Sequence, residues 1–142
     1  MRRLLLTLLA VALLLPPAGI GAQRLTTVKS HGSRFGKVLF DGRGHVLYAF
    51  TRDPRRRSAC TGVCARAWPP FIVRGRLAAA NGARRALLGT TRRTDGRVQA
   101  TYAGRPLYFY VGDRKPGQIL CQNVSEFGGL WLVVRPSGRL VR

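Results

Sequence analysis

The chain has 142 residues, of which 46% are hydrophobic, and its 25 basic and 5 acidic side chains give a formal net charge of +20. This length suits one domain with a hydrophobic core that needs no obligatory disulfide or metal. The charge would attract polyanions, but arginine outnumbers lysine 22 to 3, as expected when a GC-rich genome fills surface positions, so the charge alone does not identify a partner. The basic residues are also scattered as singles and doublets outside 52–57 and form no basic helix, which argues against a specific nucleic-acid site.

The N-terminus has the order of a secretory signal peptide. Two arginines come first, followed by an apolar run over 4–15, two prolines and small residues that end at Ala22. The run is shorter than the roughly 20 residues that span a bilayer, so we expect cleavage after Ala22 rather than a stable membrane span. No cysteine precedes Cys60. We therefore predict a signal peptide over 1–22 and a secreted, extracytoplasmic product, 23–142, without a lipid-anchor cysteine.

Strand patterns dominate the rest of the chain. Asp-Gly pairs at 41–42 and 95–96 separate β-rich runs, and this pair is the strongest short hairpin signal because both residues adopt positive φ readily. The strands expected in the first half are 25–30, 36–40, 45–50 and 71–73; those expected in the second half are 87–93, 97–102, 106–111 and 130–134, with a short tail strand at 139–141.

These strands predict one β domain built from two repeats, at about 34–75 and 86–137. The helical candidate is a short turn at 61–68 that two prolines end, and 75–85 lacks both strand and helix periodicity, so we expect a connecting loop there. We therefore predict an all-β fold in which two four-stranded antiparallel meanders form a single sandwich or a partly closed barrel.

One short pattern occurs in both halves. The segment 47–53 reads LYAFTRD, and 107–113 reads LYFYVGD. Side chains alternate along a strand, so the tyrosine and the second aromatic of each copy share one face. A buried tyrosine hydroxyl needs a partner, and the aspartate is a plausible acceptor. The pattern favours a structural strand, and a ligand face of accessible aromatics is the alternative. The residues concerned are Tyr48, Phe50 and Asp53, then Tyr108, Tyr110 and Asp113, with Trp68 and Trp131 before the last strand of each repeat.

Three cysteines in an exported chain predict one disulfide and one leftover thiol. Cys60 and Cys64 are four residues apart with a glycine between them, which makes a local bridge feasible and favoured. Cys121 is then a possible free thiol, although its pairing with either of the others stays open. A metal site of three thiols with His31 or His45 is less favoured, because neither C-x2-C nor paired-histidine spacing is present.

No catalytic pattern stands out. Two of the five carboxylates lie in Asp-Gly turns, Glu126 stands alone, and a paired-carboxylate mechanism would require Asp53 and Asp113 to meet. The histidines have no nucleophile motif beside them, and no phosphate-binding glycine loop occurs. The sequence therefore predicts a protein that is not an enzyme and has no cofactor and no metal.

Several of these segments resemble a known family. Its features here are the two Y-x-[FY]-x-x-D copies, the pattern C-x3-C-A-x-x-W-P-P at 60–70 and the G-G-x-W at 128–131. They resemble the bacterial secreted repeats of unknown function, also described as predicted lipoproteins with a Y-x-[FWY]-x-x-D motif, over about 34–137. The resemblance implies an extracytoplasmic location and a repeat architecture, but no biochemical role. Cys121 and the missing lipid-acceptor cysteine depart from the family pattern.

The function expected from these features is a binding or structural component of the bacterial cell envelope. Its partner would be an anionic cell-wall polymer or an envelope protein, and the protein would be a monomer or a thiol-linked dimer. One alternative is a small-ligand, metal or thiol-redox module that uses Cys60, Cys64 and Cys121. A second alternative is an uncharacterised hydrolase.

Overall fold

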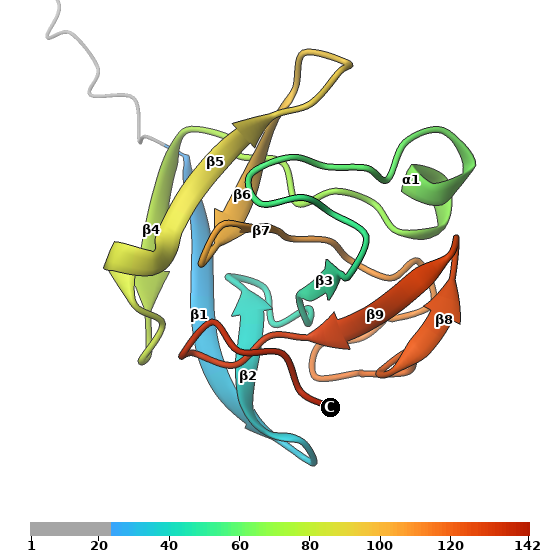
Figure 1. The fold of residues 1–142 in the computed structure, drawn as a ribbon. Helices are drawn as coiled ribbons and strands as arrows, with labels where there is room; N and C mark the ends of the chain where they lie inside the picture. Colours follow the sequence, from blue (N-terminus) through green and yellow to red (C-terminus); the bar gives the residue numbers. More distant parts are fainter. Residues whose placement is uncertain (1–23) are drawn as a thin grey trace, which may run out of the picture.

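The computed structural model describes residues 24–142, so the expected signal peptide lies outside it. Strands make up most of its regular structure, which confirms the all-β class (Figure 1). The strands are β1 (Leu25–Ser33), β2 (Gly36–Asp41), β3 (Tyr48–Phe50), β4 (Arg76–Ala80), β5 (Leu88–Arg92), β6 (Val98–Tyr102), β7 (Arg105–Pro106), β8 (Val124–Glu126) and β9 (Gly129–Val133). The helix α1 spans Val63–Ala67, inside the expected helical turn, and a 3-10 turn spans Arg85–Leu87.

The strands form three three-stranded sheets, in the orders β2-β1-β4, β3-β9-β8 and β5-β6-β7. The expected division into two four-stranded meanders in one sandwich or barrel is not confirmed, because the last segment of each repeat pairs with the other repeat. β9 of the second repeat runs antiparallel to β3 of the first, with Tyr48 opposite Val133. Conversely, Pro70 of the first repeat forms a bridge with Tyr108 of the second.

The segment 75–85 is not the simple connecting loop that the sequence predicts. It contains β4, which runs parallel to β1 with Leu25 opposite Arg76. Gly75 has a positive φ of 81°, and a side chain there would collide with the carbonyl oxygen of Arg24, so only glycine allows this close approach. An alanine-rich run has low strand propensity, and its strand conformation depends on a partner more than forty residues earlier in the chain.

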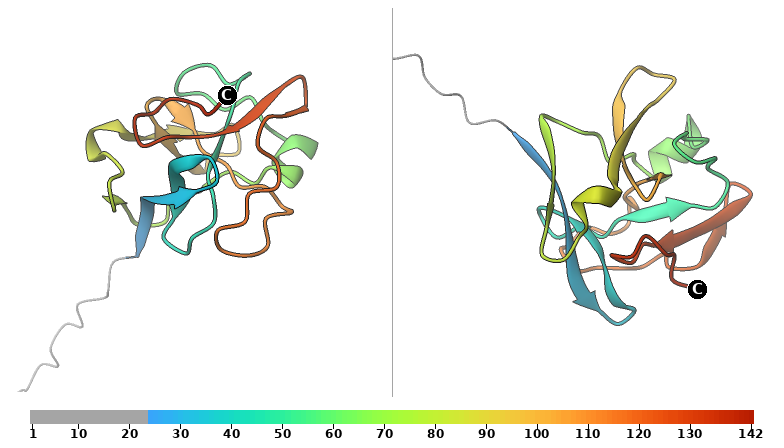
Figure 2. Two further views of the ribbon diagram at one scale, coloured as in Figure 1. Left: turned by 90° about the horizontal axis from the view of Figure 1, so that it is seen from below. Right: turned by 60° about the vertical axis from the view of Figure 1, so that its left-hand side comes forward.

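Both predicted Asp-Gly turns are present. Asp95-Gly96 joins β5 to β6, and the chain also reverses after Asp41, where Phe40 forms a bridge with Val46. In Figures 1 and 2 the β1–β2 and β5–β6 hairpins point away from each other, and β3 lies near the centre with β9 beside it. The two repeats thus lie around a shared centre.

The core has two parts because the central strands are buried on both faces. Tyr48 and Phe50 pack in one cluster with both tryptophans, while Leu47 and Ala49 pack in the other with Leu107. All of these side chains are at most 3% exposed. The alternation expected from the repeated pattern therefore directs each copy into both halves of the core at once.

Candidate functional site

The two copies of the repeated pattern meet at their first tyrosines. Tyr48 and Tyr108 lie opposite each other in an antiparallel bridge, in which each backbone amide donates to the other residue's carbonyl oxygen at 2.9 Å. The two copies, which are sixty residues apart in sequence, are thus related by an approximate twofold arrangement at the centre of the fold.

The tyrosine side chains then cross between the repeats. The Tyr48 hydroxyl donates to Asp113 Oδ2 at 2.7 Å, and the Tyr108 hydroxyl donates to Asp53 Oδ2 at 2.7 Å. The remaining oxygen of each carboxylate accepts a backbone amide, from Ala59 at 2.7 Å and from Leu120 at 2.9 Å. The expected bond between tyrosine and aspartate is present, but each acceptor belongs to the other repeat. We call these two hydrogen-bonded pairs the crossed pairs.

Burial shifts the proton affinity of the crossed pairs. It raises the pKa of Asp53 to about 6, although the hydrogen bonds from Tyr108 and the Ala59 amide and the charge of Arg93 act in the opposite direction. Burial also raises the pKa of Asp113 against the bond from Tyr48. The tyrosine pKa values rise as well, chiefly through burial, so both hydroxyls remain hydrogen-bond donors.

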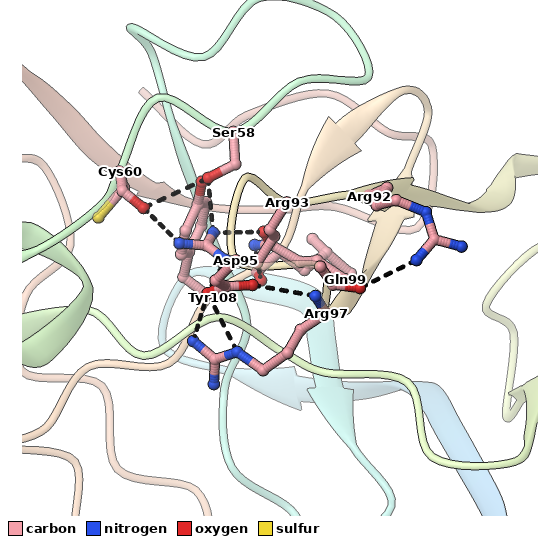
Figure 3. Close-up of polar contacts among 10 residues, drawn as sticks. Ser58, Cys60, Arg92, Arg93, Asp95, Arg97, Gln99 and Tyr108 are labelled. Atoms are coloured by element: carbon pink, nitrogen blue, oxygen red, sulfur yellow. Dashed lines mark hydrogen bonds and ion pairs between the residues drawn. The ribbon is translucent and has the colours of Figure 1, made fainter.

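A buried arginine supports one crossed pair (Figure 3). Arg93 is 5% exposed, and its guanidinium donates to Ser58 Oγ at 2.6 Å, to the Cys60 carbonyl oxygen at 2.7 Å and to Gln99 Oε1 at 2.8 Å. Ser58 Oγ lies 2.7 Å from the Tyr108 hydroxyl. Arg93 comes from the second repeat, so it fixes the loop of the first repeat that follows Asp53. Sequence reasoning missed it because nothing local distinguishes it among many arginines.

Three aromatic rings stack across the repeats beside the crossed pairs, and a fourth packs against them at a tilt of 39°. Trp68 and Trp131 are parallel, with ring centroids 4.0 Å apart and an interplanar angle of 5°. Phe50 of the first repeat covers Trp131 at 4.2 Å, and Tyr110 of the second covers Trp68 at 4.8 Å. Both indoles are fully buried, and Tyr110 is only partly exposed. The order of the rings thus alternates between the repeats.

The two indoles differ in their polar contacts. Trp68 Nε1 donates to Glu126 Oε2 at 2.8 Å, whereas Trp131 Nε1 is buried and has no hydrogen-bond partner. Within residues 24–142 it is the one buried side-chain nitrogen or oxygen without a partner. A buried donor without a partner costs free energy, so the indole N–H is stabilised by a hydrogen bond at Trp68 but not at Trp131.

The cysteines settle one of the open alternatives. Cys60 and Cys64 form the favoured disulfide, with Cα atoms 5.3 Å apart, and Cys121 is free and half-buried. Two of the three thiols are therefore not available as thiolate ligands for a metal. Burial raises the pKa of Cys121, and a hydrogen bond with Tyr110 opposes this effect. Within residues 24–142 no group of three or more His, Cys, Asp or Glu side chains is placed to hold a metal ion.

These contacts define a protein built from two sequence repeats that exchange strand segments and polar side chains. The chain belongs to the family described as "Secreted repeat of unknown function", whose model matches residues 32–71 and 89–135. Each matched region contains one tyrosine, one aspartate and one tryptophan of the central site. Searches of the curated proteins and of the solved structures find no match. Of the helices in the described part of the chain, none is long and apolar enough to cross a membrane.

Proposed function

We propose that this secreted repeat protein is a non-enzymatic module that acts at the cell envelope by binding an anionic cell-wall polymer. Cleavage of the segment 1–22 would release it from the membrane. The observation that carries the proposal is the positive charge of the folded chain, which almost no acidic side chain compensates.

The charge is distributed over the surface without matching carboxylates. Residues 24–142 carry 23 basic side chains, the 25 of the whole chain less Arg2 and Arg3, against 5 acidic ones. Within these residues the ion pairs are those of Arg93 and Arg97, both with Asp95, which leaves 21 basic side chains without a carboxylate at ion-pair distance. A surface of this kind attracts polyanions over a distance of about 10 Å at ordinary ionic strength.

The geometry of the crossed pairs supports a structural rather than a catalytic role for the family motif. Both oxygens of Asp53 and of Asp113 already accept a hydrogen bond from the protein, and both tyrosines are fully buried. A hydrolase would need a carboxylate that reaches its substrate. The raised pKa of Cys121 leaves little thiolate, which weighs against a thiol-redox role.

Binding of the purified product, residues 23–142, to cell-wall fractions tests the proposal. We expect binding to an anionic wall polymer at low ionic strength, a steep loss of binding as salt rises, and no binding to the same wall material after its anionic polymer is removed. Cys121→Ser should bind equally well. Absence of binding at low ionic strength would reject the proposal, and hydrolysis of the polymer during the assay would replace it with an enzymatic function.

A further inference from the structure

The molecule has an open groove at the edge of the shared core. Its volume is about 840 Å3, and it lies between the start of β1, the turn 41–45 and the segment 69–74. The basic side chains that line it are Arg24, Arg43, His45, Arg74 and Arg97. None of these residues belongs to the repeated motif, and sequence reasoning did not select any of the arginines.

The floor of the groove is apolar and rigid. The rings of Phe71 and Phe109 meet edge to face at 5.1 Å, and His45 meets Phe109 at 6.5 Å. Backbone hydrogen bonds fix the two phenylalanines where the repeats exchange segments, from Phe71 to the Leu107 carbonyl oxygen at 2.9 Å and from Phe109 to that of Pro69 at 2.8 Å. Phe109 and Pro69 remain partly exposed, so the groove offers an apolar surface that does not need to rearrange.

The arginine side chains that line the groove differ in the contacts that they already make. Arg97 pairs with Asp95 at 2.8 Å, so its charge is compensated. The guanidinium groups of Arg43 and Arg74 form no hydrogen bond or ion pair within residues 24–142, and both side chains are exposed. The carboxylate of the groove, Asp41, is 8% exposed and accepts two backbone amides. The groove therefore has a net positive charge and free donors.

We propose that this groove binds a carboxylated polysaccharide chain. Arg43 and Arg74 would each hold a carboxylate in the two-bond geometry that guanidinium groups favour, and the apolar faces of the sugar rings would cover Phe109 and Pro69. A polyanion without rings satisfies the arginines but leaves the floor in water, so the groove distinguishes acidic sugars from phosphate-only chains. This inference rests on the proposed function and names the site and the ligand chemistry.

Titration of the full product, residues 23–142, with three probes tests the inference. The probes are polygalacturonate, inorganic polyphosphate and neutral dextran, compared at one ionic strength. The groove variant is Arg43→Ala/Arg74→Ala, and the matched control is Arg85→Ala/Arg105→Ala. The control removes two charges that are also exposed but lie outside the groove, and their guanidinium groups form no hydrogen bond within the described chain. Because the four side chains are exposed, all variants should keep the wild-type melting temperature.

We expect the groove variant to bind polygalacturonate about 100-fold more weakly, because each lost charge-assisted contact costs about tenfold. The control should bind polygalacturonate at most about threefold more weakly than the wild type. The wild type should bind polygalacturonate more tightly than polyphosphate and should not bind dextran. Equal losses in the groove variant and the control would overturn the groove while leaving a general affinity for polyanions. Equal affinity for polyphosphate would overturn the acidic-sugar ligand. If the wild type binds neither polyanion, the proposed function fails together with the groove.

Discussion

The two repeats place the same side chains at the centre of the fold but surround them differently. In both, a tyrosine of one repeat bonds an aspartate of the other and a tryptophan stacks on its counterpart. The Tyr108–Asp53 pair also has Ser58 and Arg93 beside it, whereas the Tyr48–Asp113 pair is formed without a buried arginine. The tyrosine–aspartate bonds and the contact between the tryptophans occur in both repeats and cross between them, so the motif links the two halves.

The loops after the aspartates show where the repeats diverge. The first reads CTGVC from Cys60, and the second reads CQNVS from Cys121, so Cys121 corresponds to Cys60. Gly62 and Asn123 hold the same place, and both have a positive φ, of 55° and 62°. Beyond this point one loop enters α1 and the other enters β8. The unpaired cysteine is thus explained by its position: the second repeat has a serine where the first has Cys64.

The change in the free energy of unfolding with pH should report the protonation of Asp53 in the Tyr108–Asp53 crossed pair. The pKa of Asp53 rises from 3.8 to about 6 on folding. Because the folded state binds this proton more tightly than the unfolded chain, the stabilisation is full below pH 3.8 and is lost as the pH rises through 6. The shift corresponds to about 2 kcal/mol after allowance for partial exposure, and urea unfolding between pH 4 and 7 measures it.

Two variants separate this effect from general charge repulsion. Asp53→Asn should flatten the decline between pH 4 and 6. Asp95→Asn is the control, because Arg97 lowers the pKa of the exposed Asp95, and its stabilisation is present at high pH and lost only as the pH falls below about 3.8. A decline that persists unchanged in Asp53→Asn would show that another group, such as Asp113, whose pKa is also raised, is responsible.

Removal of single tyrosine hydroxyls should show which of the two crossed pairs contributes more to the free energy of unfolding. Tyr108→Phe removes a donor from Asp53 and a partner from Ser58, so we expect it to lower the free energy of unfolding by about 2 kcal/mol. Tyr48→Phe removes the bond to Asp113, a pair that has no serine or arginine beside it, and should cost about 1 kcal/mol. Chemical denaturation at pH 7 measures both.

The matched control for these hydroxyls is Tyr110→Phe. Its hydroxyl contacts the free Cys121 at a partly exposed position, so its loss should change stability by less than about 0.5 kcal/mol. Equal costs for all three substitutions would mean that the hydrogen bonds to the aspartates contribute no more than an exposed contact. The crossed pairs would then not hold the repeats together.

Local patterns predicted most of the strands and both Asp-Gly turns, but they missed β4 and β8, they extended the expected strands 71–73 and 106–111 beyond what forms, and they did not show how the repeats combine. Asp95-Gly96 and the alternation around Tyr48 depend on neighbouring residues, and both appear as expected. The pairing of β9 with β3 cannot be predicted from the local sequence, because a strand has the same residue pattern whether its partner lies in its own repeat or in the other. The disulfide followed from spacing, whereas Arg93 and the groove depend on contacts between distant segments.

The difference in hydrogen bonding between the indoles of Trp68 and Trp131 should have the smallest effect on stability. In the alignment of the two loops, Glu126 corresponds to Ala65, so Trp68 has an acceptor at the place where Trp131 has none. Glu126→Ala should make the two indoles alike and lower the free energy of unfolding by about 1 kcal/mol, while Glu126→Gln keeps an acceptor and should cost less than half of that. Chemical denaturation measures the stability, and the indole N–H resonances in NMR spectra identify the ring that loses its bond. If Glu126→Ala is neutral, solvent satisfies Trp68 as well as the carboxylate does. The bond to Glu126 would then contribute no stability, and the different loops would not account for an energetic difference between the two indoles.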